Sequence, residues 1–478
     1  MSLSALWLLP AAAALLAACC GRQARAVALG AAAATLGMSL MPAWAGLDSL
    51  SRLSYAGPAW FYGIRYSVAV DGLSLPLLWL TAFLTLIVIL FSWRGRFSSG
   101  YWAAFLALEA ALMGVFLMRD LFFFYLFWEA ALIPMFFIIG LWGSANRRHA
   151  AVKFFLFTFA GSVLMLLGFL VIVTQHHLAT GVWTWDMELL KSPRPGGALG
   201  LASFLALVVG FGVKVPLVPL HTWLPDAHTE APVGGSVMLA GVMLKMGVYG
   251  FLRVAIPFFP ELCWRLLPWL GGVAAVGVIY GALCAMAQQD LKRLVAYSSV
   301  AHLGFCLLGI FSRTQEGLAG GSLQLLNHGL TTGALFLLVG ALYERGHKRG
   351  LSDFGGLAGR APWLTFFFGV SIFASIGLPG LNGFVGEFMS LAGMMVRLPV
   401  LALAGVIGVT LAAAYALPAF SAVFLAEPGE GSVSAMISDL SALEALTLAA
   451  LVLPMLAIGL HPGPLLALLR SGVGGLAL

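Results

Sequence analysis

The sequence predicts an all-α polytopic membrane protein with about fourteen transmembrane helices. Hydrophobic residues make up 61% of the 478 positions, and charged residues make up only 9%. Apolar runs of about 18 to 20 residues, each long enough to cross a bilayer as a helix, recur from Leu3 almost to the C-terminus. A transmembrane β-barrel is excluded, because barrel strands alternate apolar and polar residues. We therefore expect one integral membrane domain over residues 1–478, with no soluble domain.

Three N-terminal helices are expected within residues 1–100. Their apolar runs are Leu3–Cys20, Val27–Ala45 and Leu73–Trp93. The first run also resembles a signal peptide, since Leu16-Ala17-Ala18-Cys19 is similar to a lipoprotein cleavage box. No basic residue precedes this run, which favours a membrane helix that is closed by Arg22 and Arg25. The loop after the second run carries Asp48, Arg52 and Arg65.

Two groups of apolar runs follow, in residues 101–254 and 264–425. The first group comprises Ala103–Met118, Leu121–Leu141, Val152–Val173, a helix that begins near Leu201, and Val233–Val254. The second group comprises Leu266–Ala287, Leu294–Phe311, Leu318–Tyr343, a helix that begins near Leu364, and Leu401–Leu425. A last run, Leu443–Leu460, forms the C-terminal helix within residues 441–478.

The seventh and twelfth helices are each expected to be discontinuous. Pro216, Pro219 and Pro225 interrupt the seventh, and Leu378-Pro379-Gly380 interrupts the twelfth. Proline lacks an N–H donor, so the freed backbone groups need polar side chains or water as partners. The spacing of the breaks predicts two inverted five-helix repeats, helices four to eight and nine to thirteen. Broken helices at matching positions of inverted repeats are typical of a transport site.

Basic residues cluster in the loops after helices one, three, five, nine and eleven. The later clusters are Arg147-Arg148, Lys292-Arg293 and Arg345 with Lys348-Arg349. Under the positive-inside rule these loops face the cytoplasm, so both chain termini face outward. The formal net charge of +6 therefore reflects membrane topology and does not indicate nucleic-acid binding.

Sites for redox groups and nucleotides are not predicted. The five cysteines are scattered without a C-x-x-C pair, which gives no framework for an iron–sulfur cluster or zinc. No G-x-G-x-x-G or phosphate-binding loop occurs. Any redox chemistry linked to this protein is expected on other chains.

Four charged residues lie inside apolar stretches: Glu129, Lys214, Lys245 and Glu387. A charge at the bilayer centre costs about 2.5 kcal/mol or more, and such residues typically mark ion pathways. Lys214 lies at the break in helix seven, and Glu129 is its expected partner. The pair would act as a charge switch, because moving or protonating the glutamate changes the proton affinity of the lysine. A static structural ion pair is the alternative interpretation.

The other two charged residues have different surroundings. Lys245 is central in its helix and has no carboxylate one turn away, which argues against snorkelling and favours a proton relay. Glu387 follows the break in helix twelve, much as Lys214 lies beside the break in helix seven. An ordinary acid near a helix N-terminus, favoured by the helix dipole, is the alternative for Glu387.

Four histidines extend the set of candidate relay groups, because histidine titrates near neutral pH. His302 and His328 lie in the tenth and eleventh helices, where a purely hydrogen-bonded role is the alternative. His221 and His228 flank the run Thr222–Ala227, where packing within a loop is the alternative. A third zinc ligand is lacking beside them. Lys292 and Arg293 are expected to set topology, although one of them could contact the polar chain from the cytoplasmic side.

Several motifs together resemble the antiporter-like subunits of respiratory complex I, a group within the cation/proton antiporter superfamily. The motifs are Phe127-Trp128-Glu129 with Pro134, Lys214-Val215-Pro216, the run His221–His228, Ala231-Pro232 ahead of Lys245, Asp290–Arg293 with Tyr297-Ser298-Ser299, and Gly386-Glu387-Phe388. The resemblance covers nearly the whole chain. Sister chains of this group typically carry a lysine at the position of Glu387.

The resemblance implies proton translocation as part of NADH-quinone oxidoreductase. It assigns Glu129 paired with Lys214, then Lys245, to the relay, with Glu387 as the exit-side group and His302 and His328 on a central polar axis. It implies no cofactor on this chain, since NADH, FMN, iron–sulfur clusters and quinone belong to partner chains. The expected partners are other membrane-arm subunits, including sister antiporter-like subunits, in the bacterial inner (plasma) membrane.

Three other functions remain open at this point. A subunit of a multi-chain sodium/proton antiporter would use the same fold without redox partners. A membrane subunit of an energy-converting hydrogenase would also share the fold. A purely structural membrane scaffold would not require the buried charges for transport.

Overall fold

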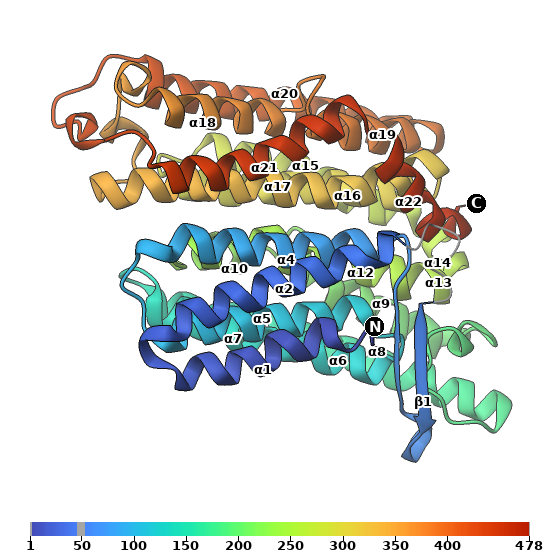
Figure 1. Cartoon of the computed structure of the whole chain (residues 1–478). Helices are drawn as coiled ribbons and strands as arrows, with labels where there is room; N and C mark the ends of the chain where they lie inside the picture. Colours follow the sequence, from blue (N-terminus) through green and yellow to red (C-terminus); the bar gives the residue numbers. More distant parts are fainter. Residues whose placement is uncertain (1, 45–52, 478) are drawn as a thin grey trace.

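Long helices that lie side by side make up nearly all of the protein, which confirms the predicted helical membrane fold (Figure 1). The computed structural model describes residues 2–44 and 53–477, so the loop residues Asp48 and Arg52 lie outside the described residues. Twelve of the described helices are long and apolar enough to cross a membrane, and Ala5–Cys19 and Pro362–Ser375 are shorter apolar helices. The count of fourteen and the two inverted repeats remain predictions.

The N-terminal half contains the helices up to the middle of the chain. Its α-helices are α1 (Ala5–Cys19), α2 (Ala24–Trp44), α4 (Ser74–Phe91), α5 (Ser99–Leu117), α6 (Leu121–Ala130), α7 (Leu132–Trp142), α8 (Arg147–Thr180), α9 (Gly197–Lys214), α10 (Trp223–Glu230), α11 (Val233–Met238), α12 (Leu244–Gly250), α13 (Ile256–Phe258) and α14 (Pro260–Arg265). Two π-helical segments, η5 (Leu239–Met243) and η6 (Phe251–Ala255), flank α12 and join it to its neighbours in one continuous span.

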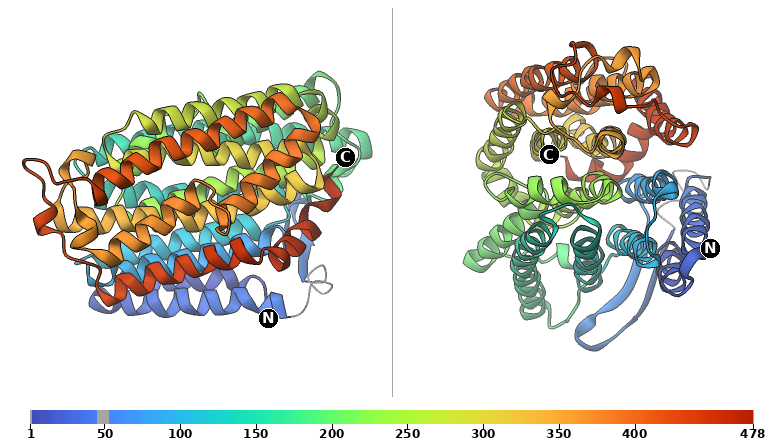
Figure 2. Two further views of the ribbon diagram at one scale, coloured as in Figure 1. Left: turned by 90° about the horizontal axis from the view of Figure 1, so that it is seen from above. Right: turned by 90° about the vertical axis from the view of Figure 1, so that its left-hand side faces the viewer.

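The C-terminal half forms a second group of helices, seen apart from the first when the bundle is viewed along its length (Figure 2). Its α-helices are α15 (Leu267–Met286), α16 (Leu291–Ser312), α17 (Gln315–Gly346), α18 (Pro362–Ser375), α19 (Asn382–Arg397), α20 (Pro399–Phe420), α21 (Ala442–Leu460) and α22 (Gly463–Val473). A third π-helical segment, η9 (Ser421–Leu425), continues α20.

The two halves meet along α17, which packs against α11, η5 and α4, while α10 packs against α16. Small residues allow this close approach. A Cβ atom added to Gly329 of α17 would lie 2.9 Å from the carbonyl oxygen of Gly241 in η5. Interfaces between membrane helices use such residues because lipid supplies no hydrophobic driving force for helix association. The span containing α12, together with α16 and α17, is therefore almost entirely buried by protein.

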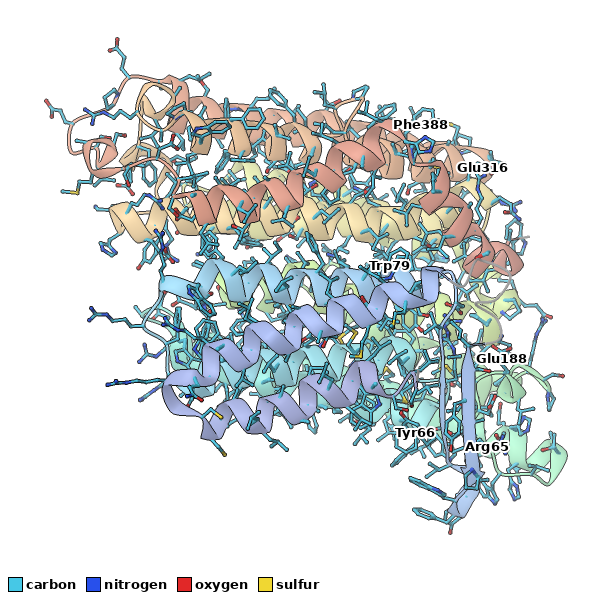
Figure 3. The ribbon with its side chains drawn as sticks, in the orientation of Figure 1. Arg65, Tyr66, Trp79, Glu188, Glu316 and Phe388 are labelled. Atoms are coloured by element: carbon cyan, nitrogen blue, oxygen red, sulfur yellow. The ribbon has the colours of Figure 1, made fainter. Side chains whose placement is uncertain are left out.

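A two-stranded antiparallel hairpin covers one end of the bundle, where the sequence predicted only a polar loop. Strands β1 (Ser54–Ala59) and β2 (Arg65–Ala69) form it, and Arg65 and Tyr66 lie on it at the end where both chain termini are found (Figure 3). The Tyr66 hydroxyl donates to Ser4 Oγ at 2.7 Å and accepts from Trp7 Nε1 at 2.9 Å. The hairpin is thereby tied to the start of α1.

Both predicted helix breaks are confirmed. Helix α9 ends at Lys214 and α10 begins at Trp223, while α18 ends at Ser375 and α19 begins at Asn382. The second break contains Gly377 and Gly380 with φ of 75° and 92°, a backbone region that favours glycine. Pro225 was expected to interrupt a helix, but it lies in the first turn of α10. Backbone N–H groups of the first turn have no partner within the helix, so proline costs no hydrogen bond there.

The fold also places a buried acid, Asp120, at the start of α6. Its Oδ1 accepts from the backbone N–H groups of Phe122 and Phe123, and its Oδ2 accepts from the N–H of Arg65 at 2.9 Å. Burial is the main cause that raises the pKa of Asp120 to about 6. An unfolded aspartate has a pKa of about 3.9. Because the folded value is the higher one, this contribution to stability is present below pH of about 4 and is lost as pH rises through about 6.

We expect Asp120→Asn to remove this pH dependence, which amounts to about 3 kcal/mol. Asparagine caps a helix about as well as aspartate, although the hydrogen bond from Arg65 would be lost at every pH. Thermal unfolding of the wild type and the variant, followed across this pH range, provides the test. The same slope of unfolding temperature against pH in both proteins would contradict the prediction.

Candidate functional site

Lys245 lies in the buried span that contains α12, where α12 packs near α17, and its partner is a histidine. It belongs to α12 and is fully buried. Its Nζ donates to the carbonyl oxygen of Ala240 in η5 and lies 2.7 Å from Nδ1 of His328 on α17. No acidic side chain lies within 4.0 Å of Nζ in the described part of the chain. The π-helical turns around α12 were not predicted, and such turns are frequent at functional sites.

A second histidine continues the polar chain towards Glu387. The rings of His328 and His302 lie with their centroids 5.9 Å apart. His302 Nδ1 is 2.9 Å from Glu387 Oε1, and its Nε2 is 3.0 Å from Ser375 Oγ at the end of α18. Four side chains from four separate helices thus lie next to one another in a row. They are Lys245 of α12, His328 of α17, His302 of α16 and Glu387 of α19.

Glu387 is buried within α19, and it is not an acid of the first helical turn. Its side chain is 5% exposed, and its Oε1 also accepts from Gln324 Nε2 of α17 at 3.0 Å. The first turn of α19 contains no acidic residue. The alternative that Glu387 is simply stabilised by the helix N-terminus therefore does not fit its position, since the dipole effect fades within the first turn.

The break between α18 and α19 borders a small polar cavity of about 10 Å³. His302 and His328 line it, and so does Asn327, whose Nδ2 donates to the carbonyl oxygen of Asn382 at the start of α19. Nε2 of His328 and Oδ1 of Asn327 are buried without a protein partner. A polar cavity of this size accommodates about one water molecule. The space between the two histidine rings is therefore suited to a proton step through water.

Lys214 and Glu129 form a second, separate polar cluster. Lys214 is 1% exposed at the end of α9, and its Nζ lies 5.7 Å and 5.8 Å from the ring centroids of Trp128 and Phe154. These distances permit cation–π attraction. Glu129 lies in the last turn of α6, with the Ser162 hydroxyl beside its carboxyl group.

The predicted contact between Glu129 and Lys214 is not formed in this structure. No salt bridge within 4.0 Å joins them among the described residues, and the Lys214 ammonium and Glu129 Oε1 both lack hydrogen-bond partners. The two charges still influence each other over a longer distance. The described residues also provide no hydrogen bond between Lys214 and Lys245, so the two polar clusters are not joined by direct contacts.

The two histidines of the His221–His228 run have different environments. His228 of α10 is fully buried, stacks on Phe336 at 4.7 Å, and has no partner on either ring nitrogen. The charges of Lys245 and Lys292 both act on it. His221 is also buried but packs edge-on against Tyr280 at 5.2 Å. His228 therefore lies close to the Lys245 cluster, whereas His221 faces α15.

Lys292 is the residue whose burial the sequence did not reveal. It was expected mainly to set topology, yet it is 7% exposed, and its Nζ donates to the carbonyl oxygen of Ala231. It lines a cavity of about 280 Å³ together with Arg349 and Glu344. Its position at the first turn of α16, two residues after Asp290, looks like an ordinary helix boundary in the sequence.

Two further charged residues lie outside these clusters. Lys153, in the second turn of α8, forms an ion pair with Asp226 at 2.6 Å near the surface. Glu109 of α5 is fully buried, and neither of its carboxyl oxygens has a hydrogen-bond partner.

Comparisons with known proteins relate this arrangement to a transport family. The family described as "NADH:quinone oxidoreductase/Mrp antiporter, TM" matches residues 118–412. NADH-quinone oxidoreductase subunit M of Rhodobacter capsulatus is 42% identical over 468 residues, which are 95% of this chain and 90% of the relative. Subunit M of Escherichia coli (strain K12) is 39% identical, over 87% of this chain and 83% of the relative.

Solved structures show the same fold. A chain of respiratory complex I from Thermus thermophilus matches with a TM-score of 0.90 and 34% identity, over 100% of both chains. A chain of the Mrp complex from Dietzia sp. matches with a TM-score of 0.87 over 99% of this chain and 97% of that one, but at 23% identity the likeness concerns the fold alone. The chain therefore belongs to the NADH:quinone oxidoreductase/Mrp antiporter transmembrane family, and within it to the subunit M group.

Proposed function

We propose that the chain is a proton-translocating, antiporter-like subunit of NADH-quinone oxidoreductase, which couples quinone reduction elsewhere in the complex to proton pumping. Its relatives at about 40% identity carry the name of that enzyme's subunit M. The observation that carries the proposal is a buried row of polar side chains, which are, in spatial order, Lys245, His328, His302 and Glu387. Each neighbour in it is within hydrogen-bond distance or one water-sized gap of the next.

In this mechanism Lys245 holds a proton and passes it to His328. A charged Lys245 donates to Nδ1 of His328, and a neutral Lys245 can accept the proton back. Transfer from His328 to His302 uses the small polar cavity between the rings. Glu387 then receives the proton at Oε1, where His302 is already within 2.9 Å. The π-helical turn matters because it presents the Ala240 carbonyl to Lys245 and so holds the ammonium in place.

In the same proposal, Glu129 and Lys214 act as a charge switch, in which the distance between the two groups controls whether Lys214 holds a proton. Because Lys214 is buried without a hydrogen-bond partner, its charge depends on how close Glu129 comes. In this proposal the Lys214 end of α9 moves relative to α6 at the break between α9 and α10. Pumping one charge against 100 mV costs about 2.3 kcal/mol, a size that rearranging one buried pair can supply.

Proton uptake is assigned to the cavity beside Lys292. This cavity lies at the end of the bundle that carries the clustered basic loops, which the positive-inside rule places in the cytoplasm. The charges of Lys292 and Lys245 both act on His228, and its two ring nitrogens have no protein partners. Both chain termini then face outward from the inner membrane.

The partners are the other membrane-arm subunits, including sister antiporter-like subunits. We assign no redox group to this chain, because its five cysteines are scattered without a C-x-x-C pair. NADH, FMN, iron–sulfur clusters and quinone are assigned to other chains of the complex.

Affinity purification of the tagged chain in mild detergent tests the proposal. We expect the hydrophilic subunits that oxidise NADH and sister membrane subunits to co-purify, and the sample to reduce quinone with NADH. Recovery of antiporter subunits alone, without NADH-oxidising chains, would instead assign the chain to a multi-chain sodium/proton antiporter. Recovery with hydrogenase subunits would assign it to an energy-converting hydrogenase.

A further inference from the structure

Helix α14 and the C-terminus lie at the same end of the bundle (Figure 1). A cavity of about 590 Å³ is lined by residues of this end. Four separate parts of the chain line it: the segment before α9, the stretch formed by α13 and α14, the turn after α16 and the residues near the C-terminus. Its volume falls in the range of about 300 to 1,000 Å³ that is usual for ligand sites. None of the proposed relay residues lines it.

The lining of this cavity is strongly basic. It contains Lys191, Arg194, Arg265 and Arg313 but only one acid, Glu261, which leaves a net charge of +3. Glu261 lies 3.7 Å from Arg194, and both side chains are largely exposed, so this contact neutralises little. Arg265 forms no ion pair within 4.0 Å among the described residues. Glu188, seen at the same end of the molecule in Figure 3, lies outside the lining and pairs with Lys191 at 2.6 Å.

Arg313 is the buried member of this group. It is 4% exposed, and its guanidinium donates to the carbonyl oxygens of Pro260 and Leu476 at 2.8 Å and 3.2 Å. These partners fix its orientation without cancelling its charge. Burial is the main cause that lowers the pKa of Arg313, and the guanidinium groups of Arg397 and Arg194 lower it further. The accumulated positive charge therefore favours an anion in the cavity.

Exposed tryptophans place the cavity near the membrane surface. Trp264 lines it and is 45% exposed, and Trp269, at the start of α15, is 75% exposed. Tryptophan gathers at the level of lipid headgroups, because its ring is apolar and its N–H is polar. The Arg397 guanidinium lies 4.9 Å from the Trp264 ring centroid. An anion at this depth would be available from lipid as well as from solution.

We propose that this cavity binds a phosphate group, supplied by the headgroup of an anionic phospholipid or by soluble phosphate. Arginine suits this ligand, since its planar guanidinium can form two parallel hydrogen bonds to phosphate oxygens. The exposed side chains of Arg194 and Arg265 would bind the phosphate oxygens directly. The buried guanidinium of Arg313 would add a fixed positive charge.

The double variant Arg194→Gln/Arg265→Gln tests the site. Both residues are exposed, so folding should not depend on them. The control is Arg147→Gln/Arg148→Gln, which removes two exposed arginines at the opposite end of the bundle. The purified assembly is analysed for retained phosphatidylglycerol, and its thermal stability is then measured in nanodiscs of phosphatidylcholine with and without phosphatidylglycerol. A separate arm adds inorganic phosphate to the delipidated assembly.

We expect the wild type and the control to retain phosphatidylglycerol and to be stabilised by it, and the double variant to bind it about tenfold more weakly. If inorganic phosphate stabilises the wild type but not the variant, while phosphatidylglycerol has no such effect, soluble phosphate is the ligand. If neither compound distinguishes the variant from the control, the proposal is overturned. NADH-quinone reductase activity is not used as the readout, so failure here would leave the proposed function untouched.

Discussion

Lys245→Met is expected to abolish proton translocation through this chain. The substitution keeps an unbranched side chain of similar length but removes the only group in α12 that can hold and release a proton beside His328. Loss of a positioned proton carrier lowers a rate by about 10²-fold or more. NADH-driven acidification of membrane vesicles, measured with a fluorescent ΔpH probe, checks this result. Oxidation of NADH with a water-soluble acceptor should be unchanged, since it does not need the membrane arm.

Lys245→Arg distinguishes two possible roles of Lys245, a proton carrier and a fixed positive charge. Arginine keeps the positive charge but does not lose its proton in proteins, so it should block translocation nearly as well as methionine. Lys348→Met, which removes an exposed lysine, is the matched control and should have no effect. A scaffold role makes the opposite prediction, since pumping would then survive both Lys245 substitutions once the complex is assembled.

Glu387→Gln is expected to have the second largest effect. Glutamine has the same shape but cannot take up a proton from His302 at the position now 2.9 Å away. The hydrogen bond from Gln324 Nε2 can persist to the amide oxygen, so the fold around α19 should be retained. We therefore expect translocation to fall by about 10²-fold without loss of assembly. The same vesicle assay, together with subunit analysis of the purified complex, provides the measurement.

Two comparisons make the Glu387 result specific. Glu387→Asp keeps the carboxyl group at a shorter reach and should recover part of the activity. Glu316→Gln removes an exposed acid at the start of α17 and should leave translocation unchanged (Figure 3). Full activity of Glu387→Gln would show that the proton does not leave through this carboxyl group.

The helices and their breaks could be predicted because both are local properties of the sequence. Long apolar runs fix the membrane spans, and proline and glycine fix the breaks after Lys214 and Ser375. The hairpin Ser54–Ala69 was missed because its strands are short, six and five residues, and Gly57 and Pro58 interrupt the pattern of the first strand. Packing against the end of the bundle stabilises it, as the Tyr66 contacts with α1 illustrate. The π-helical turns depend on tertiary packing in the same way.

The identity of the charged residues was also predictable, but their partners were not. A lysine within an apolar helix is conspicuous, whereas its contact with a histidine 83 residues away depends on the packing of α12 against α17. The expected Glu129–Lys214 contact rested on charge complementarity, and the structure instead places the Lys214 ammonium within about 6 Å of two aromatic rings. The burial of Lys292 was not predicted, because a basic residue at the start of a helix is usually read as a topology signal.

The ratio of protons translocated to electrons transferred, measured in proteoliposomes for Lys245→Met, Glu387→Gln and the double variant, tests the relay most directly. Residues that act in series on one path fail as a unit, so their effects are not additive. We predict that each single variant lowers the ratio by the full share of this chain and that the double variant lowers it no further. A double variant whose loss equals the sum of two partial losses would show two independent paths and would contradict the account.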